Sequence, residues 1–448
     1  MAQSLPKLLV LLLLALGLPL ALPVVCAVAV AQTTPTAPAG GDDAVRFKIQ
    51  AGGRDLYKIA IPLPTGGDKN AATQAAAQLN NDLSLSGFFK VIDSSATLAN
   101  LQAEGLTINA PDWRNVGAEG VVKGRFTPMG GDVKVEFRLY EVSRGDQPVL
   151  SKDYRAPANG LRGVIHSWAG EIVRYYTNED PFFNSRIVFS AGIAKMRRDL
   201  FVMDWDGAGV YGITKSSQNI LPSWSPNASE VAFTSYLAGK PDLYSMPSSG
   251  GKPRVISSRP GLNMGAAYSP DGSKIAATLS QDGNSEIYLL SRDGAIIKRL
   301  TSNTFIDTSP SWSPDGNRIA FVSDRFGSPQ IWTMNADGSN QQRLSRRGNY
   351  NQTPRWSPRK DQPLIAFTAR DEKYNYDIFT LNADTGEVVR ITEGHGSNQN
   401  PSWAPNGRAI AYESSRGGIW ISTFDGRTER QVYKGAASSP SWSPLLGR

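Results

Sequence analysis

Side chains suited to catalysis are scarce in this chain of 448 residues. It contains two histidines, His166 and His395, and one cysteine, Cys26. A Ser-His-Asp hydrolase needs one positioned histidine, and a metal site usually needs two or three. Because His166 lies on an expected helix and His395 in an expected loop between glycines, we assign both a structural or surface role. The sequence also has no nucleophile elbow, no phosphate-binding P-loop and no dinucleotide-binding glycine loop.

Asp-Gly pairs are the other pattern that could suggest chemistry, because carboxylates bind cations. The pairs begin at Asp206, Asp271, Asp293, Asp315, Asp337 and Asp425. They lack the alternating carboxylate spacing of a calcium-binding loop. Asp and Gly are both favoured in tight turns, so each pair predicts a turn. We therefore expect a binding scaffold with no catalytic residues, no cofactor and no metal ion.

The elements that carry these turns repeat along the second half of the chain. An aromatic residue before Ser-Pro or Ala-Pro recurs at Trp224, Tyr268, Trp312, Trp356, Trp403 and Trp442. The spacings are 44, 44, 44, 47 and 39 residues. A period of about 40–45 residues with several short strands is typical of β-propeller blades. Within residues 311–344, apolar stretches separated by Pro, Asp and Gly predict four strands per blade.

The boundaries of the repeats do not coincide with the ends of the propeller region. The series starts with a second-strand element at 187–189 and ends with a first-strand element at 440–442. Pairing these two elements completes the sixth blade and leaves no open sheet edge. The sequence therefore predicts an all-β six-bladed propeller over residues 181–448, closed by the C-terminal strand.

An α/β N-terminal domain is predicted over residues 45–180. Apolar residues at helical spacing predict helices at 69–86 and 159–176. Alternating segments predict strands between them, including a hairpin whose turn is the Met-Gly-Gly stretch at 129–131.

Residues 1–31 are predicted to be a secretory signal peptide, and residues 32–44 a disordered tail. The uncharged run after Lys7 ends in Ala-Val-Ala at 29–31, the small-residue pattern of a cleavage site. The run is long enough to span a bilayer, so an uncleaved anchor is the alternative. After cleavage we expect no cysteine and no membrane insertion.

The formal charge of +7 lies mostly in the propeller region, where residues 186–448 carry 30 basic and 23 acidic side chains. This mild bias suits an acidic protein partner or a cell-wall polymer. It is not the clustered basic stripe of a nucleic-acid-binding protein, so we expect no nucleic acid.

The loops that enter the innermost strands of a propeller surround its channel mouth, where a rigid frame presents binding residues. Here these loops are rich in Asn, Gln and Ser, with Met264, Phe305 and Tyr350 as large anchors. This composition favours a protein–protein site. The loops are 216–221, 258–266, 302–309, 346–353, 393–400 and 434–439.

Nearly the whole chain after residue 44 resembles the TolB family, the periplasmic component of the Tol-Pal system. The segments that carry the resemblance are VRFKIQAGG with YKIAIPLP, GVVKGRFTP, the WSPDG-type repeats and the terminal PSWSP. The resemblance implies a periplasmic, non-enzymatic monomer. It also implies a role in outer-membrane integrity and in drawing the envelope inward at cell division.

Two protein partners are implied by this resemblance. The mouth loops would bind Pal, a peptidoglycan-associated lipoprotein, and the segment after the signal peptide would bind the C-terminal domain of TolA. The predicted Pal-binding residues of these loops are Asn263, Met264, Phe305, Asp307, Thr308, Tyr350, Asn351, His395 and Asn398, of which Asn263 and Thr308 are carried over by position from the family. The TolA-binding segment comprises Ala44, Val45, Arg46, Phe47, Lys48, Ile49, Gln50 and Asp55. The chain departs from the family in the tail that precedes Val45 and in Leu262, where some relatives have histidine.

Two alternatives remain open from the residues alone. A secreted propeller hydrolase or lyase would place a cluster of carboxylates or histidines at the channel mouth. A direct peptidoglycan binder would bind the cell wall without a protein partner.

Overall fold

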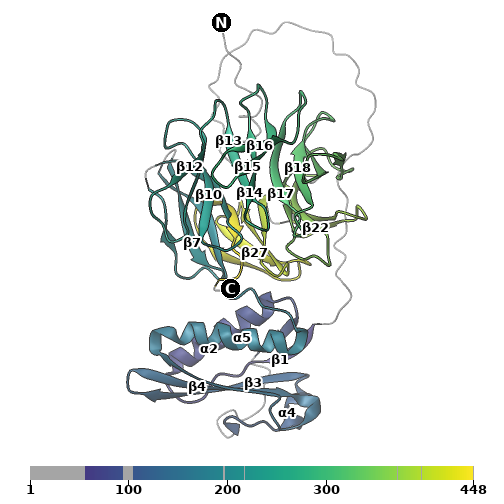
Figure 1. Ribbon diagram of the computed structural model, residues 1–448. Helices are drawn as coiled ribbons and strands as arrows, with labels where there is room; N and C mark the ends of the chain where they lie inside the picture. The colour runs from purple at the N-terminus through teal and green to yellow at the C-terminus, as the bar shows by residue number, and fades with distance from the viewer. Residues whose placement is uncertain are drawn as a thin grey trace, which may run out of the picture.

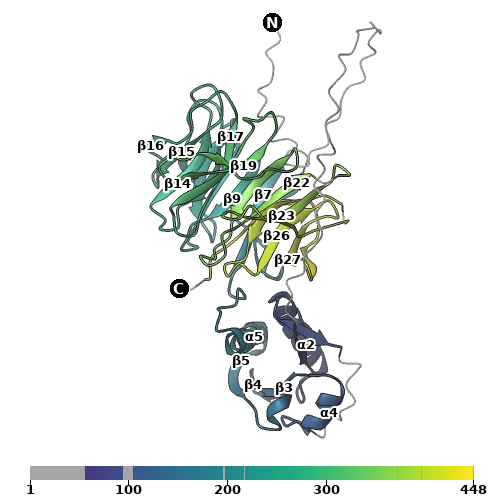
Figure 2. The same cartoon turned by 90° about the vertical axis from the view of Figure 1, so that its right-hand side faces the viewer.

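A computed structural model of the chain describes residues 56–93, 104–194, 197–215, 217–370, 372–394 and 396–446. The expected signal peptide, the tail, the TolA-binding segment and His395 lie outside these residues. The described part forms an α/β domain and a β-propeller (Figure 1). The two long helices of the α/β domain lie between its sheet and the propeller (Figure 2). No helix in these ranges is long and apolar enough to cross a bilayer.

The N-terminal sheet has the strand order β2-β1-β3-β4-β5. Its strands are β1 (Tyr57–Ala60), β2 (Phe89–Ile92), β3 (Gly120–Met129), β4 (Asp132–Glu141) and β5 (Leu150–Pro157). β1 is parallel to β2 and β3, whereas β3, β4 and β5 are antiparallel. The turn between β3 and β4 contains Gly130 at a φ of 68°, which glycine adopts at low cost. The hairpin predicted at this turn is confirmed.

Two long helices cover one face of this sheet, as predicted. They are α2 (Lys69–Leu85) and α5 (Leu161–Thr177). The short helix α4 (Ala110–Asn115) lies against the other face, where its Trp113 packs with Val121 and Tyr140. The domain also contains the 3-10 turns η2 (Val142–Arg144) and η3 (Ala158–Gly160). The Asp68 carboxylate caps α2 by accepting the Ala71 N–H at 3.0 Å. Trp168 of α5 stacks on Phe137 of β4 with ring centroids 5.3 Å apart. The sequence analysis missed α4, because a six-residue helix with a proline near its start has too few turns to show a period.

The propeller consists of six four-stranded antiparallel sheets, described here from the channel outwards. Blade 1 comprises β29 (Ala437–Trp442), β6 (Arg186–Ala194), β7 (Arg197–Asp204) and β8 (Tyr211–Gly212). Blade 2 comprises β9 (Asn219–Trp224), β10 (Glu230–Ser235), β11 (Asp242–Pro247) and β12 (Arg254–Ser257). Blade 3 comprises β13 (Asn263–Tyr268), β14 (Lys274–Leu279), β15 (Glu286–Ser291) and β16 (Ile296–Arg299).

The remaining three blades repeat this pattern. Blade 4 comprises β17 (Asp307–Trp312), β18 (Arg318–Ser323), β19 (Gln330–Asn335) and β20 (Gln342–Arg343). Blade 5 comprises β21 (Asn351–Trp356), β22 (Leu364–Arg370), β23 (Tyr376–Asn382) and β24 (Val388–Arg390). Blade 6 comprises β25 (Asn398–Trp403), β26 (Ala409–Ser414), β27 (Ile419–Thr423) and β28 (Glu429–Tyr433).

Blade 1 joins the two ends of the propeller region. Its innermost strand, β29, pairs antiparallel with β6, so that Trp442 lies opposite Ile187 and Ser438 opposite Ser190. The Trp442 indole N–H also donates to the Ser185 hydroxyl at 2.8 Å. The predicted fold, an α/β domain followed by a six-bladed propeller closed by the C-terminal strand, is confirmed.

The recurring aromatic residues join neighbouring blades. The Trp224 indole N–H donates to the Ser441 carbonyl at 2.9 Å, and the Trp403 indole N–H donates to the Arg355 carbonyl at 2.9 Å. In each pair the acceptor lies on the innermost strand of the preceding blade. Blades 2 and 6 therefore each rely on the preceding blade to satisfy a largely buried donor.

A β-bulge with a left-handed residue interrupts every innermost strand. The six residues are Leu221, Gly265, Ser309, Thr353, Asn400 and Ser439, with φ between 51° and 62°. Five of them are not glycine, so the conformation costs energy that contacts must offset. The Asn400 N–H donates to the Thr368 hydroxyl of the preceding blade at 3.1 Å, which is one such contact.

Charged and polar side chains connect the N-terminal domain to the propeller. Beyond α5, the Glu179 carboxylate forms ion pairs with Arg359, at 3.2 Å, and with Arg408. The Asn406 amide donates to the Asp180 carbonyl at 3.2 Å. Asn406 and Arg359 lie just beyond the aromatic ends of their innermost strands. The domain therefore contacts the end of the propeller opposite the predicted mouth loops.

A second, more buried network lies between α2, α5 and blade 1. His166 of α5 places Nδ1 2.7 Å from an Asp82 oxygen and Nε2 3.6 Å from an Asp206 oxygen. Arg162, one turn earlier on α5, forms ion pairs with Asp204 and Asp206. The two carboxylates raise the pKa of His166 to about 9 against the opposing effect of its burial. The imidazole is therefore a cation at neutral pH, which fits the structural role expected for it.

Candidate interaction face of the propeller

The mouth face consists of the loops that precede the six innermost strands. Buried polar triads hold several of these loops in place. Ser345 donates to the Gln330 side-chain oxygen at 2.7 Å, and the Asn351 amide donates to the same oxygen at 2.9 Å. Equivalent triads in other blades are Asp199 with Thr214 and Asn219, and Asp377 with Thr392 and Asn398. Satisfied buried networks of this kind rigidify the backbone that carries them.

Four of the sequence-predicted site residues are buried in such networks. Asn263, Asp307, Asn351 and Asn398 are each at most 1% exposed. Their side chains do not reach the surface in this structure, so they shape the loops rather than present themselves to a partner. Met264 is also buried, at 2% exposure, and packs against Ile220.

The loop before β17 presents Phe305, which is 42% exposed. The Asp307 carboxylate at its end accepts from Arg325 at 2.7 Å and from the Asn303 amide at 2.8 Å. The Phe305 N–H donates to the Asn303 side-chain oxygen at 2.7 Å. An aromatic ring is thus held outward on a loop that hydrogen bonds to Asn303 and Asp307 hold in place. Thr308, the next predicted residue, is half-buried at the start of β17.

The loop before β21 presents an aromatic group built around Arg370. The Arg370 guanidinium lies 5.5 Å from the centroid of the Tyr350 ring and 5.1 Å from that of Tyr374. Tyr374 is 74% exposed, and Tyr350 also packs on Tyr376 at 5.8 Å. Arg370 donates to the Asn349 side chain at 2.8 Å, which joins this group to the loop. Burial raises the pKa of Tyr350 to about 12, so its phenol is neutral at physiological pH.

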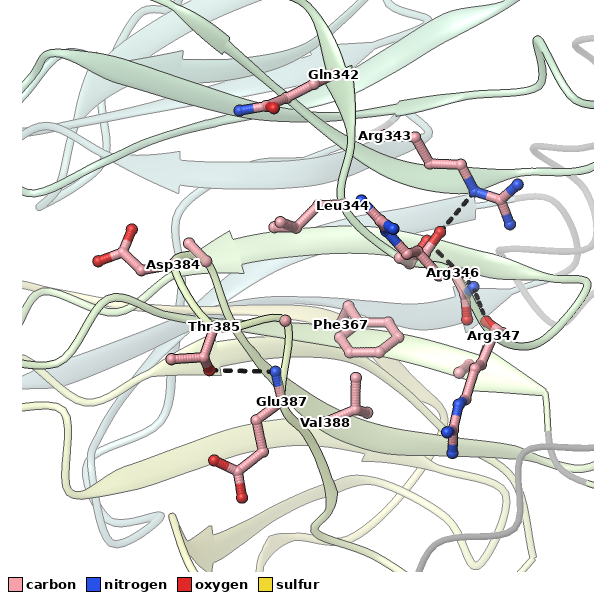
Figure 3. Close-up of a pocket in the computed structure, with 15 residues that line it drawn as sticks. Gln342, Arg343, Leu344, Arg346, Arg347, Phe367, Asp384, Thr385, Glu387 and Val388 are labelled. Atoms are coloured by element: carbon pink, nitrogen blue, oxygen red, sulfur yellow. Dashed lines mark hydrogen bonds between the residues drawn. The ribbon is translucent and has the colours of Figure 1, made fainter.

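Beside this loop, a groove of about 700 Å³ lies between blades 4 and 5. Phe367 and Val388 lie toward its centre, with Arg343, Arg346 and Arg347 on one side (Figure 3). Asp384, Thr385 and Glu387 line the other side. Burial and the nearby charge of Arg346 lower the pKa of Arg343. The sector of the mouth face over blades 4 and 5 is therefore aromatic and rich in arginine.

Comparison with protein families gives two matches that together span both domains. A family described as the TolB amino-terminal domain matches residues 45–148, and one described as the TolB beta propeller domain matches residues 174–446. The chain belongs to the TolB family.

Individual TolB proteins agree with this assignment. The "Tol-Pal system protein TolB" of Myxococcus xanthus is 41% identical over 190 residues, which cover 41% of this chain and 43% of that protein. The protein of the same name from Cereibacter sphaeroides is 34% identical over 244 residues, 52% of this chain and 55% of its own length. The chain thus spans about half of these curated relatives. The crystal structure of TolB from Acinetobacter baumannii superposes with a TM-score of 0.76 at 28% identity, covering 87% of this chain and 97% of that one.

The sequence analysis of this TolB-family chain overlooked the residues that support the anchors. Arg370 is the last residue of β22, Tyr374 lies in the loop that follows it, and Arg325 lies in the equivalent loop of blade 4. These loops lie at the same end of the blade as the loops that precede the innermost strands. A search for aromatic residues and arginine in both sets of loops would have found them. His395 and the segment 44–55 lie outside the described residues, so their expected roles stay predictions.

Proposed function

We propose that this chain is a non-enzymatic binding protein of the Tol-Pal system that acts in the periplasm. It binds the lipoprotein Pal through the mouth face and the C-terminal domain of TolA through the segment 44–55. By linking these partners it contributes to outer-membrane integrity and to constriction of the envelope during cell division. Membership of the TolB family supports this proposal, as do the relatives named as Tol-Pal system proteins.

The structural observation that carries the proposal is the presentation of aromatic side chains on a rigid frame. Phe305 and the Tyr350–Arg370–Tyr374 group lie on loops that are held by hydrogen bonds from Asn303 to Asp307 and from Arg370 to Asn349. Exposed aromatic residues and arginine contribute most of the affinity in many protein interfaces. Rigid loops lose little entropy when they bind, which favours a preformed partner site. The mouth carboxylates of Asp307 and Asp377 accept hydrogen bonds from Arg325 and Thr392, which hold the loops in place.

The proposed Pal site can be tested by replacing either of two aromatic residues, Phe305 or Tyr350, with a charged residue. Phe305→Glu and Tyr350→Glu are each expected to weaken Pal binding about tenfold or more, because each places a carboxylate in a desolvated contact. Isothermal titration calorimetry with the purified Pal domain measures the affinity, and a thermal melt verifies folding.

Ile297→Glu is the matched control, since Ile297 is 50% exposed on β16, the outermost strand of blade 3. Equal affinity for Phe305→Glu, Tyr350→Glu and Ile297→Glu would place the Pal site elsewhere.

The proposed binding of TolA by the segment 44–55 can be tested separately. A chain that starts at Leu56 is expected to lose binding to the TolA C-terminal domain and to keep binding to Pal, because the two sites use different segments. A pull-down with each purified partner measures both interactions. Retained TolA binding would show that the propeller or the α/β domain carries that site.

A further inference from the structure

The innermost strands contain one position at which a single blade differs from the other five. Pairing with the second strand of each blade places Ser311 opposite Ala320, Ser402 opposite Ala411 and Arg355 opposite Ala366. The equivalent residues in the other blades are Ser223, Ala267 and Ser441. Five blades thus have Ser or Ala where blade 5 has arginine, the largest cationic side chain.

Arg355 carries a charge that the described protein does not neutralise. Its one hydrogen bond runs from Nη1 to the Pro354 carbonyl at 3.3 Å, and no described carboxylate lies within ion-pair distance. Burial lowers its pKa to about 10, so the guanidinium is still protonated at neutral pH. Arg355 is half-buried on the wall of the channel, so its remaining N–H donors are available to a ligand there.

A cavity lies where Arg355 enters the channel. It has a volume of about 570 Å³ and is lined by Arg355, the five small residues of the other blades and the prolines that follow the aromatic positions. The ring of Trp224, Tyr268, Trp312, Trp356, Trp403 and Trp442 forms its wall. Pro405, which also lines it, adjoins Asn406, whose amide contacts the N-terminal domain. The cavity is therefore at the opposite end of the propeller from the mouth face.

We propose that this cavity is a binding site for a small amphiphilic oxyanion, with Arg355 as the counter-charge. The planar guanidinium fork matches a carboxylate or a phosphate group in size and hydrogen-bond direction. The tryptophan and proline wall would contact an apolar or aromatic body, which is the usual division of roles in a small-molecule site. The cavity shares no residue with the proposed Pal and TolA contacts, so the outcome of its test is independent of the proposed function.

Binding can be measured with benzoate, its neutral analogue benzamide and inorganic phosphate as probes. Tryptophan fluorescence and calorimetry on the full chain are expected to show saturable one-to-one binding of benzoate. Benzamide is expected to bind at least about tenfold more weakly, since it lacks the charge that Arg355 would neutralise. If phosphate binds as tightly as benzoate, the affinity comes from the charge alone. The proposal that the ligand has an apolar body would then be wrong.

The deciding variant is Arg355→Ser, which gives blade 5 the residue found in four other blades. This variant is expected to bind benzoate at least about tenfold more weakly than the wild type. Its melting temperature is expected to stay the same or rise, because an unpaired charge is removed. Arg318→Ser is the control: Arg318 stacks on Trp356 at 4.9 Å and pairs with Asp384 at 3.0 Å, outside the channel. Equal benzoate affinity in the wild type, Arg355→Ser and Arg318→Ser, or no saturable benzoate binding to the wild type, would overturn the proposal.

Discussion

A chain that ends at Ser438 is expected to lose the cooperative stability of the whole propeller. The deletion removes most of β29, including Trp442, which is 6% exposed and belongs to the core shared with α5 and blade 6. It also leaves the Trp224 indole without its acceptor on Ser441 and one edge of β6 without a partner. Loss of a buried tryptophan alone costs about 3–5 kcal/mol. We therefore expect a fall in melting temperature of about 10 °C or more.

Differential scanning calorimetry measures this change, and limited proteolysis shows how far the disorder spreads. The control is a chain that ends at Leu446, which keeps β29 and the hydrogen bond from the Asn184 amide to the Leu446 carbonyl. Closure predicts that the shorter chain is cleaved in several blades, whereas fraying of one end predicts cleavage near Arg186 alone. Identical melting of the two chains would contradict the closure mechanism.

Raising the pH from 7 to 10 is expected to weaken the contact between the N-terminal domain and the propeller. The pKa of His166 is about 9 in the folded protein, above the value of about 6.5 for a free imidazole. Its contribution to stability is therefore fully present below about pH 6.5 and is lost as the pH rises through about 9. The shift corresponds to about 3 kcal/mol for this one group. Asp206, whose pKa the neighbouring cations lower, contributes in the opposite direction and loses its stabilisation only in acid.

The measurement is hydrogen exchange in α5 and in the loop after β7, followed as a function of pH. His166→Gln removes the titrating group, so it is expected to be less stable at pH 7 and to lack the loss between pH 7 and 10. It leaves Asp82 and Asp206 without their shared cation, and breaking a buried pair in this way costs about 3–5 kcal/mol. Ser167→Ala, one residue along α5 on its exposed side, is the control. A pH profile of His166→Gln that matches the wild type would assign the dependence to other groups.

The fold was largely predictable because its determinants are local and repeated. The aromatic residue before Ser-Pro marks the end of each innermost strand, so its period gave the number of blades, and its register gave the closure by β29. The helices α2 and α5 showed their apolar spacing directly in the sequence.

The candidate site was less predictable, because composition does not reveal the direction of a side chain. Asn263 and Asn351 occur in polar loops, yet their amides point into the blade and bond to groups from the preceding strands. Phe305 and Tyr350 lie in loops, as the sequence predicts, but the arginine beside Tyr350 comes from the end of strand β22. The unusual character of Arg355 became visible only after strand pairing aligned it with serine and alanine in the other blades.

The pairing of β29 with β6 also sets the order of events during folding. Blades 2 to 6 each consist of consecutive strands and can form from one stretch of chain, whereas blade 1 must wait for the last strand of the chain. The α/β domain precedes all of them and can fold first. A prematurely released chain would therefore carry a finished N-terminal domain beside an exposed, unpaired β6. Proteases can reach such an edge, and other chains can pair with it. Incomplete copies would therefore differ from complete ones in protease sensitivity and in self-association before they reach any partner.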